Sequence, residues 1–553
     1  MAALQQTLGT PLAMAESPFA NATARESGMV SAAAAALQQS PTRYTVSALL
    51  FSVLVYLYRR SIPVLDAKEP PLMLPRIPFV GHLIGLIKNQ AEYYTDLRNT
   101  TEAAIATLPM LGGKTYAIWD PALAQSALRQ KTLSFEPFLV DFSQTMLGMK
   151  EESYEAFREM PELVAEFFDT LHVTVRGEPL RRMNLNALKY ISSRLDGAKG
   201  EKQMPMPNLY LWLRELMTSA TTTALLGRKN PFLHRPELVD DLWTWENAIP
   251  TMLITPYHSV TSAAAFRARE KLQKELARYY AARCDEDDTA AAVTRERAAV
   301  LRKYGFPDDE IGKFEAGLLQ LATSNTIPTT FWMVANILAR PDLVARLREE
   351  LDPLVRRTQD VAAVNVVALD EASPLLASCY RESIRLSNHA LCVRRVVEDT
   401  TVSDGRGESY VLKKGSDVHI PGGYTHRAED VWGANAAEYD ADRFANRRGK
   451  LSAHAQAEKN KRAAYIPFGG GRHLCPGRNF ASAEILGITA ALVLAFDMSA
   501  DGRGCPPRLP PMASTTIMGG ASKPERQGEG TSLVMQRRPG WEAVTFEFEL
   551  VGS

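Results

Sequence analysis

The sequence predicts a mainly helical protein with small β-sheets, built as one large domain behind a single N-terminal membrane anchor. Helical periodicity dominates from about residue 85 onward, and turn-rich extended stretches occur around residues 394 to 425 and near the C-terminus. An uncharged apolar run near the N-terminus is followed by a cluster of prolines. No internal repeat of roughly 20 to 50 residues and no second domain is apparent after these prolines.

The composition excludes several classes of protein. A chain of 553 residues, 46% hydrophobic and 23% charged, can bury a large core, which excludes a small binding module, a disordered chain and a multi-span membrane protein. Lys plus Arg equals Asp plus Glu at 63 each, and no local basic patch stands out, so we expect no nucleic-acid partner. The five cysteines show neither CxxC pairing nor zinc-finger spacing, which indicates a reducing compartment.

The N-terminal residues predict a tail and an anchor. Residues 1–42 are rich in Ala, Ser, Gln and Thr and are expected to form a flexible tail. Residues 43–60 form the predicted transmembrane anchor, whose uncharged core, Tyr44 to Tyr58, spans roughly 22 Å as a helix. The hydrocarbon core is roughly 30 Å thick, so the flanking arginines must reach the interface. A buried helix or a signal peptide is the alternative, although no small-residue cleavage site follows.

Positive charges predict the orientation of this anchor. Arg59, Arg60 and Lys68 follow the apolar run, and the positive-inside rule then places the downstream chain in the cytosol. The tail would lie in the lumen, where the sequon at Asn21 would be available for glycosylation. Residues 61–84 are proline-rich and predict a stiff linker, and residues 85–553 form the large domain.

A long helical pattern runs from Ile311 to Ala339 and contains a proline. Pro328 has no N–H for the carbonyl of Ser324, so the helix is expected to open beside Asn325 and Thr326. An opened helix can hold water or a ligand. The alternative is that these polar side chains only hydrogen-bond to the preceding turn.

Two further stretches carry charged or reactive side chains. Glu382 and Arg385 stand three apart in a helical window, which by itself predicts a surface ion pair. The glycine-rich turn from Phe468 to Gly477 delivers one cysteine, Cys475, just before the apolar helical pattern Phe480 to Met498. It is not a dinucleotide or Walker loop, because Leu474 occupies the third glycine position and no Walker lysine follows.

A thiolate at a helix N-terminus is stabilised by the helix dipole and by free backbone N–H groups. Small residues before the cysteine would let a flat macrocycle approach the backbone. Cys475 is therefore predicted to be a thiolate ligand of iron, and a buried structural cysteine is the alternative.

In this turn the chain resembles the cytochrome P450 family, of the fungal type. The run Asn325-Thr326-Ile327-Pro328 resembles the branch that holds sterol 7α-hydroxylases and prostacyclin synthase. The resemblance implies one haem domain that binds haem b, with Cys475 as the axial iron ligand. The other cofactor-binding residues that it implies in this turn are Phe468, Gly471, Arg472, His473 and Gly477. His473 departs from the family pattern, in which arginine is commoner, but a histidine can still hydrogen-bond a haem propionate.

The resemblance implies roles for residues outside this turn as well. Glu382 and Arg385 would lock to Arg443 in a structural network, and either Arg394 or Arg395 would bind a haem propionate. Asn325 and Thr326 would be catalytic residues on the distal side of the haem, where Asn325 replaces an acid and cannot ionise. Two segments would line an apolar substrate pocket, Ser387 to Leu391 and Thr516 to Gly519.

The implied activity is that of a monooxygenase of the endoplasmic reticulum membrane. It would use O2, and electrons from NADPH-cytochrome P450 reductase, to oxidise an apolar terpenoid, steroid, polyketide or fatty acid in fungal secondary metabolism. An isomerase or dehydratase that needs neither O2 nor reductase is the alternative that Asn325 keeps open. A haem sensor without turnover is the second alternative.

Overall fold

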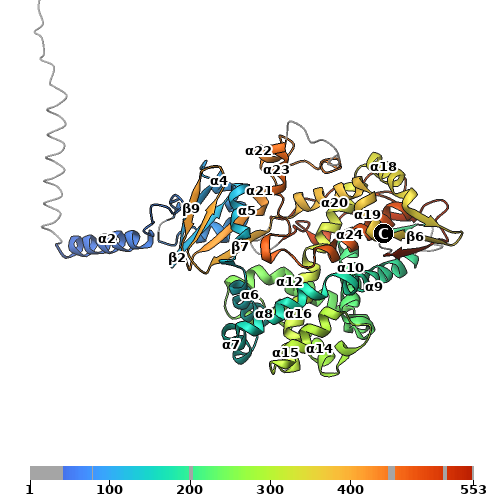
Figure 1. The fold of residues 1–553 in the computed structure, drawn as a ribbon, viewed down its shortest axis with the longest axis horizontal. Coiled ribbons are helices and arrows are strands. Elements are labelled where there is room, and N and C mark those ends of the chain that lie inside the picture. Colours follow the sequence, from blue (N-terminus) through green and yellow to red (C-terminus); the bar gives the residue numbers. More distant parts are fainter. Residues whose placement is uncertain (1–40, 78, 198–202, 446–454, 515–519, 551–553) are drawn as a thin grey trace, which may run out of the picture.

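The computed structural model describes residues 41–77, 79–197, 203–445, 455–514 and 520–550, and it shows a helical body with a sheet at one end (Figure 1). The prediction of a mainly helical fold with small sheets is confirmed. The tail predicted over residues 1–42, with Asn21, falls almost entirely outside the described residues, and so does the loop Thr516 to Gly519.

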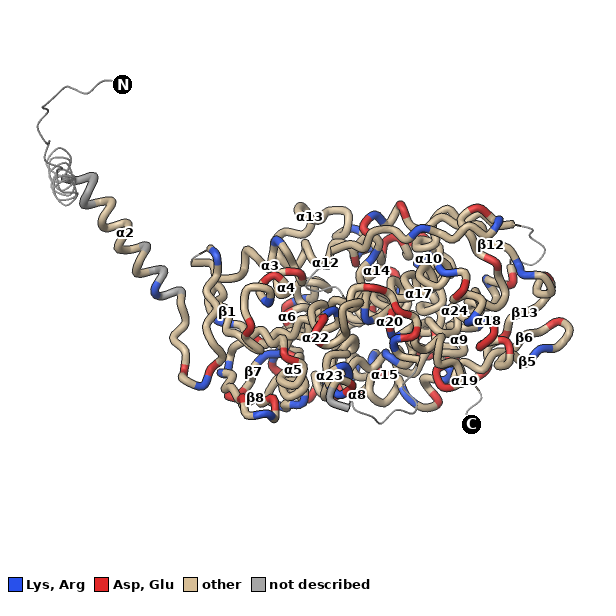
Figure 2. Tube along the Cα trace, turned by 90° about the horizontal axis from the view of Figure 1, so that it is seen from above, with Lys and Arg blue, Asp and Glu red and all other residues tan. Residues whose placement is uncertain are grey.

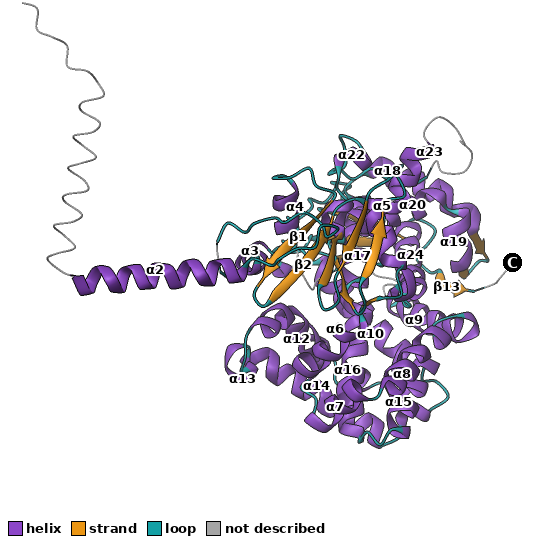
Figure 3. Ribbon diagram, turned by 60° about the vertical axis from the view of Figure 1, so that its left-hand side comes forward, coloured by secondary structure: helices purple, strands orange, loops and turns teal. Residues whose placement is uncertain are grey.

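Within the described residues, three helices precede the sheet: α2 (Pro41–Ser61), α3 (Leu83–Asn89) and α4 (Glu92–Arg98). Helix α2 extends away from the body (Figures 1 and 3). Figure 2 shows charge on α2 towards its C-terminal end, whereas acidic and basic residues are interspersed over the body. The proline-rich segment predicted as a linker also contacts the large domain. Met73 N–H donates to the carbonyl of Thr107 (2.9 Å), and Glu69 pairs with Lys114.

The largest sheet is mixed and joins segments that are far apart in the sequence. Its strands, in spatial order, are β1 (Ile105–Met110), β2 (Gly113–Ile118), β10 (Asp417–Pro421), β7 (Leu391–Val396) and β3 (Leu133–Ser134). Strands β2 and β10 are parallel, and the other neighbours are antiparallel. Strands β8 (Thr400–Ser403) and β9 (Ser409–Leu412) form a hairpin beside it.

Two three-stranded sheets bring the C-terminal residues onto the helical body. The first sheet consists of β4 (Met204–Met206), β11 (Phe496–Ser499) and β12 (Leu533–Arg537). The second consists of β5 (Val355–Arg357), β6 (Val361–Asn365) and β13 (Thr545–Glu549). The extended stretches expected after residue 394 and near the C-terminus are thus both present.

Helices make up the rest of the described body. Up to the middle of the chain they are α5 (Pro121–Arg129), α6 (Glu136–Leu147), α7 (Glu151–Glu159), α8 (Pro161–Thr174), α9 (Gly177–Asp196), α10 (Leu209–Leu226), α11 (Pro231–His234), α12 (Glu237–Ile254), α13 (His258–Thr261) and α14 (Ala263–Ala281). They continue with α15 (Ala292–Lys303), α16 (Asp308–Ser324), α17 (Thr326–Leu338), α18 (Pro341–Leu351), α19 (Val366–Ala372), α20 (Pro374–Ser387), α21 (Gly422–Thr425), α22 (Glu429–Trp432), α23 (Ala455–Ala464) and α24 (Arg478–Ala495).

The core forms where α17, α20 and α24 pack against one another. Among the described helices, α24 has the length and composition to cross a membrane, but most of it is buried within the body, as expected of a core helix. The sequence predicted a helical end at Met498, but α24 ends three residues earlier, at Ala495. The next residues, Phe496–Ser499, form strand β11 and pair with β12.

The long predicted helix is broken where the proline predicts. Helix α16 ends at Ser324, α17 begins at Thr326, and Asn325 lies between them. The hydroxyl of Thr326 donates to the carbonyl of Ala322 (3.1 Å), which is the back-bonding that the sequence left open.

A buried carboxyl group lies between α10 and α24. Glu484 is fully buried, and its described hydrogen bond is from the hydroxyl of Thr221 (3.0 Å). Burial raises the pKa of Glu484 to about 8, so the folded protein carries this group protonated at neutral pH.

This raised pKa predicts a pH-dependent effect of Glu484→Gln. The unfolded chain loses the proton near pH 4.5 and the folded protein only near pH 8, so the group lowers stability by about 1.4 kcal/mol per pH unit between these values. The glutamine keeps an oxygen for Thr221 and has no such cost. We expect urea unfolding to show the variant gaining on the wild type from pH 5 to pH 8, and a constant difference would refute this.

Candidate active site

The cysteine selected from the sequence lies in the loop before α24. Its N–H donates to the carbonyl of Phe468 (3.0 Å), and its carbonyl accepts from Arg478 (2.9 Å). Burial raises the pKa of the Cys475 thiol, while the backbone N–H groups of Gly477 and Arg478 act to lower it. The sulfur is therefore surrounded by backbone donors that favour a thiolate once a cation offsets the cost of burial.

Glycine at position 471 allows the backbone of this loop to approach α5 closely. Gly471 has a φ of 64°, and a Cβ there would overlap the carbonyl oxygen of Leu128. Phe468 packs against the main core, which holds the start of the loop. At Gly477, by contrast, a Cβ would meet no atom within 4 Å.

Helix α20 carries a fully buried ion pair. Arg385 donates from Nε and from Nη2 to the two carboxylate oxygens of Glu382, both at 2.7 Å. Arg443, the third residue of the predicted network, also contacts this pair, since its Nε donates to Glu382 (2.9 Å). The remaining donors of Arg385 bind the carbonyls of His426 and Ala436 (both 2.6 Å). The structure thus brings together the three residues of the expected network.

The end of α20 connects the cysteine loop to the break between α16 and α17. Asn388 donates to the carbonyl of Pro467 (3.0 Å), at the start of the cysteine loop, and also pairs with Ala521. Ala521 N–H in turn donates to Oδ1 of Asn325 (2.8 Å). Asn388 lies within the predicted pocket segment Ser387 to Leu391, but its link to the cysteine loop was not predicted. No sequence motif marks Ala521, and sequence reasoning missed it.

One side of the broken helix stays exposed. Leu321 is 59% exposed and Asn325 is exposed one turn later, whereas Thr326 is buried. Residues four apart in a helix share a face, so these two side chains form one strip, which we call the exposed strip. Leu321 is thus a large apolar side chain exposed on an otherwise mostly buried helix, on the same face as Asn325.

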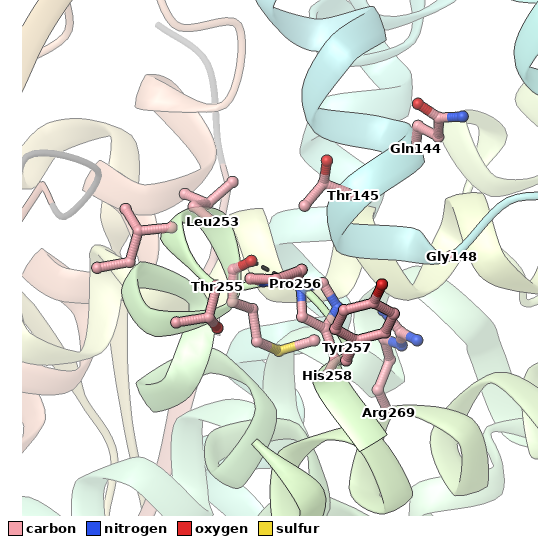
Figure 4. A pocket seen from close by; sticks show the side chains of 11 residues that line it. Gln144, Thr145, Gly148, Leu253, Thr255, Pro256, Tyr257, His258 and Arg269 are labelled. Atoms are coloured by element: carbon pink, nitrogen blue, oxygen red, sulfur yellow. Dashed lines mark hydrogen bonds between the residues drawn. The ribbon is translucent and has the colours of Figure 1, made fainter. Parts of the chain in front are cut away.

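Another cavity contains none of the predicted site residues. Figure 4 shows it between α6, α12, α13 and α14, with a volume of about 450 Å³. His258 in its wall donates to the carbonyl of Met252 (2.7 Å), and Arg269 donates to that of Met146 (2.9 Å). None of the residues predicted to bind the cofactor or to act in catalysis lines this cavity, so we assign it no part in the chemistry.

Residues 70–520 match the family model for cytochrome P450. This chain belongs to the cytochrome P450 family. It is 38% identical over 500 residues to a cytochrome P450 monooxygenase of Gibberella zeae, which covers 90% of this chain and 94% of that relative. It is 28% identical over 269 residues to 25-hydroxycholesterol 7-alpha-hydroxylase of Rattus norvegicus, covering 47% of this chain and 63% of that enzyme.

A retinoic acid-bound cyanobacterial P450, CYP120A1, shares the fold with a TM-score of 0.64 at 16% identity, over 86% of this chain and all of that one. The relatives confirm the predicted family, its fungal type and its relation to sterol 7α-hydroxylases. The chain is a P450 monooxygenase, an oxidoreductase whose family holds a haem iron.

The described residues fit a haem group near the P450 cysteine. Arg394 is buried and donates to the carbonyls of Val393 (2.7 Å) and Gly470 (3.3 Å), but its Nε has no partner among the described residues. A buried cation with a free donor beside the cysteine loop suits an anionic group such as a propionate. Arg395, by contrast, pairs with Asp417 and is partly exposed.

The two other basic residues of the loop differ from each other. Burial, Arg394 and Arg472 lower the pKa of His473 to about 4, so its imidazole is neutral. Its Nε2 accepts the N–H of Phe135 (3.3 Å), which assigns the proton to Nδ1. Arg472 is half-exposed and pairs with Glu136.

The buried P450 ion pair predicts a large effect of Arg385→Leu. The variant would leave Glu382 as a buried charge with one partner fewer, and it would leave the carbonyls of His426 and Ala436 short of a donor. We expect a loss of about 3–5 kcal/mol in the free energy of unfolding.

Arg381→Leu is the matched control, because Arg381 lies on the same helix and pairs with Asp370 in a more exposed place. Its expected cost is under about 1 kcal/mol. Urea unfolding followed by circular dichroism measures both variants, and equal losses would contradict the role given to the buried pair.

Proposed function

We propose that this monooxygenase binds haem b, is anchored in the endoplasmic reticulum membrane, and receives electrons from NADPH-cytochrome P450 reductase. It oxidises an apolar small molecule in fungal secondary metabolism. The observation that carries the proposal is the partly buried Cys475, with backbone donors from Gly477 and Arg478, in a loop that Arg394 contacts at the carbonyl of Gly470.

The residues of the chain divide the work of holding the cofactor. Cys475 would ligate the iron, Arg394 would donate from its free Nε to a propionate, and neutral His473 would offer Nδ1–H to the same group. When bound, the haem supplies the activation of O2, with the thiolate as electron donor to the iron. Thr326 and Asn325 lie at the helix break, where a hydroxyl and an amide can hold water.

Helix α2 supports the membrane anchor. Its 21 residues correspond to about 31 Å, of which the uncharged stretch Tyr44 to Tyr58 accounts for roughly 22 Å, so the arginines at its ends would have to reach the interface for the helix to span the hydrocarbon core. Leu49, Leu50 and Phe51 are exposed on α2, and this helix extends away from the body (Figure 1). Arg59 and Arg60 lie at its C-terminal end, so the positive-inside rule leaves the haem domain in the cytosol, on the side of the reductase.

The relatives and the exposed strip support the class of substrate. The Rattus norvegicus relative is named for a hydroxylation of 25-hydroxycholesterol, and the Gibberella zeae relative is fungal. Leu321 makes the strip apolar apart from the amide of Asn325. A terpenoid or steroid-like skeleton fits this combination best.

Deletion of the gene in its native host tests the proposed function. We expect high-resolution mass spectrometry to find an accumulating compound that is lighter by one oxygen atom than the product that disappears, because a monooxygenase inserts one atom of O2. Reintroducing the intact gene is the control. Compounds that are isobaric or differ by water would overturn the proposal in favour of an isomerase or dehydratase.

The assignment of the propionate partner is tested by neighbouring variants. Arg394→Leu removes the buried cation, whereas Arg395→Leu removes a partly exposed partner of Asp417. We expect the first to lower the haem content per purified protein severalfold and the second to leave it near the wild-type value. Pyridine haemochrome assays measure this, and the reverse order would reassign the residue.

A further inference from the structure

The amide of Asn325 has a fixed orientation. Ala521 N–H donates to its Oδ1 (2.8 Å), and a backbone N–H can only donate, so the oxygen faces Ala521 and the Nδ2 group faces away. Asn325 is exposed beside Leu321, and within the described residues no acceptor binds Nδ2. The amide therefore presents a hydrogen-bond donor on the exposed strip.

The segment that holds this amide is itself held on both sides. Gly520 accepts the N–H of His389 (2.8 Å), and Ser522 N–H donates to the carbonyl of Ser387 (2.8 Å). The carbonyl of Ser522 accepts from the indole of Trp332 on α17 (2.7 Å). Residues 520–522 thus form a clamp between the end of α20 and α17, which we call the amide clamp.

Glycine at position 520 is needed for the close approach. A Cβ there would overlap Oδ1 and Cγ of Asn325, while the backbone of Gly520 does not have a positive φ. The requirement is therefore for space beside the amide and not for an unusual backbone conformation.

We propose that Gly520 and Ala521 are positioning residues that hold Asn325 with Nδ2 as a donor to an oxygen atom of the bound ligand. The inference rests on the proposed function and adds to it the class of ligand. The substrate is an apolar molecule that carries a hydrogen-bond-accepting oxygen, such as a hydroxyl or carbonyl, beside the carbon that is oxidised. A diatomic gas bound at the iron is the other source of such an acceptor.

Three variants of the full-length holoenzyme separate the donor from the clamp. Asn325→Asp keeps an oxygen for Ala521 N–H and, ionised at pH 8, loses the donor. Gly520→Ala keeps the donor and displaces it. Gly528→Ala is the matched control, because a Cβ there meets nothing within 4 Å.

The first measurement uses carbon monoxide as the probe. Infrared spectra of the ferrous complex report its C–O stretch, which a nearby donor lowers. We expect Asn325→Asp and Gly520→Ala to move the band to higher wavenumber if the donor reaches a ligand on the iron, and Gly528→Ala to leave it in place. A small shift in D2O should occur in the wild type and be lost in Asn325→Asp.

The second measurement is a spectral titration with the compound that accumulates in the deletion strain. If the donor reaches a substrate oxygen, both variants should bind it roughly five- to tenfold more weakly, the usual effect of one lost neutral hydrogen bond. A shift in either measurement supports the inference and identifies the source of the oxygen.

Unchanged band and affinity in both variants would overturn the inference alone, and so would an equal effect of Gly528→Ala. A wild-type carbon monoxide spectrum without the thiolate-ligated form would overturn the proposed function and this inference with it. If Gly520→Ala does not fold, Asn325→Asp, which keeps the clamp, still decides the outcome.

Discussion

The buried pair of Glu382 and Arg385 is the constraint on which the surrounding structure depends. Neither charge is exposed to solvent, and a buried charge is tolerated only when its hydrogen-bonding groups are all engaged. The pair therefore draws in other segments: the carbonyls of His426 and Ala436 accept from Arg385, and Arg443 donates to Glu382. Residues 426–443 must wrap around α20 for the pair to exist.

Once α20 is fixed in this way, its C-terminal end positions both sides of the site. Asn388 binds the carbonyl of Pro467, which begins the loop that carries Cys475. The same end binds the amide clamp, which orients Asn325. The thiol of Cys475 and the amide of Asn325 belong to segments about 150 residues apart. Hydrogen bonds connect both segments to the C-terminal end of α20.

Local chemistry in the sequence was enough to predict several of these features. Cys475 and its glycines are contiguous, and Pro328 breaks its helix through its own missing N–H, so neither prediction needed a distant residue. The antiparallel pair β1 and β2 was not predicted, and its pairing with β10 depends on residues some 300 positions away. The contact of Ala521 with Asn325 is of the same kind, because backbone N–H groups leave no mark in a sequence.

The choice between Arg394 and Arg395 shows a signal that was present and not used. Cys392, Arg394 and Val396 are the buried residues of β7, alternating with more exposed ones. Side chains of a strand alternate between its two faces, so Arg394 lies on the same face as the apolar residues Cys392 and Val396, which is the inner face. A buried arginine in an apolar register is unusual enough to mark the inward-facing one as the functional candidate.

The neutral His473 gives Arg394 a larger electrostatic role than the family pattern implies. An arginine at position 473 would add a second cation beside the cofactor, but this imidazole is neutral and accepts a hydrogen bond from Phe135. Arg472 is matched by Glu136, and Arg395 by Asp417. Arg394 is then a buried cation beside the loop without a carboxylate partner among the described residues, and under the proposed function it would balance the charge of a propionate. Burial lowers the pKa of its guanidinium, and a bound anion of this kind would act in the opposite direction.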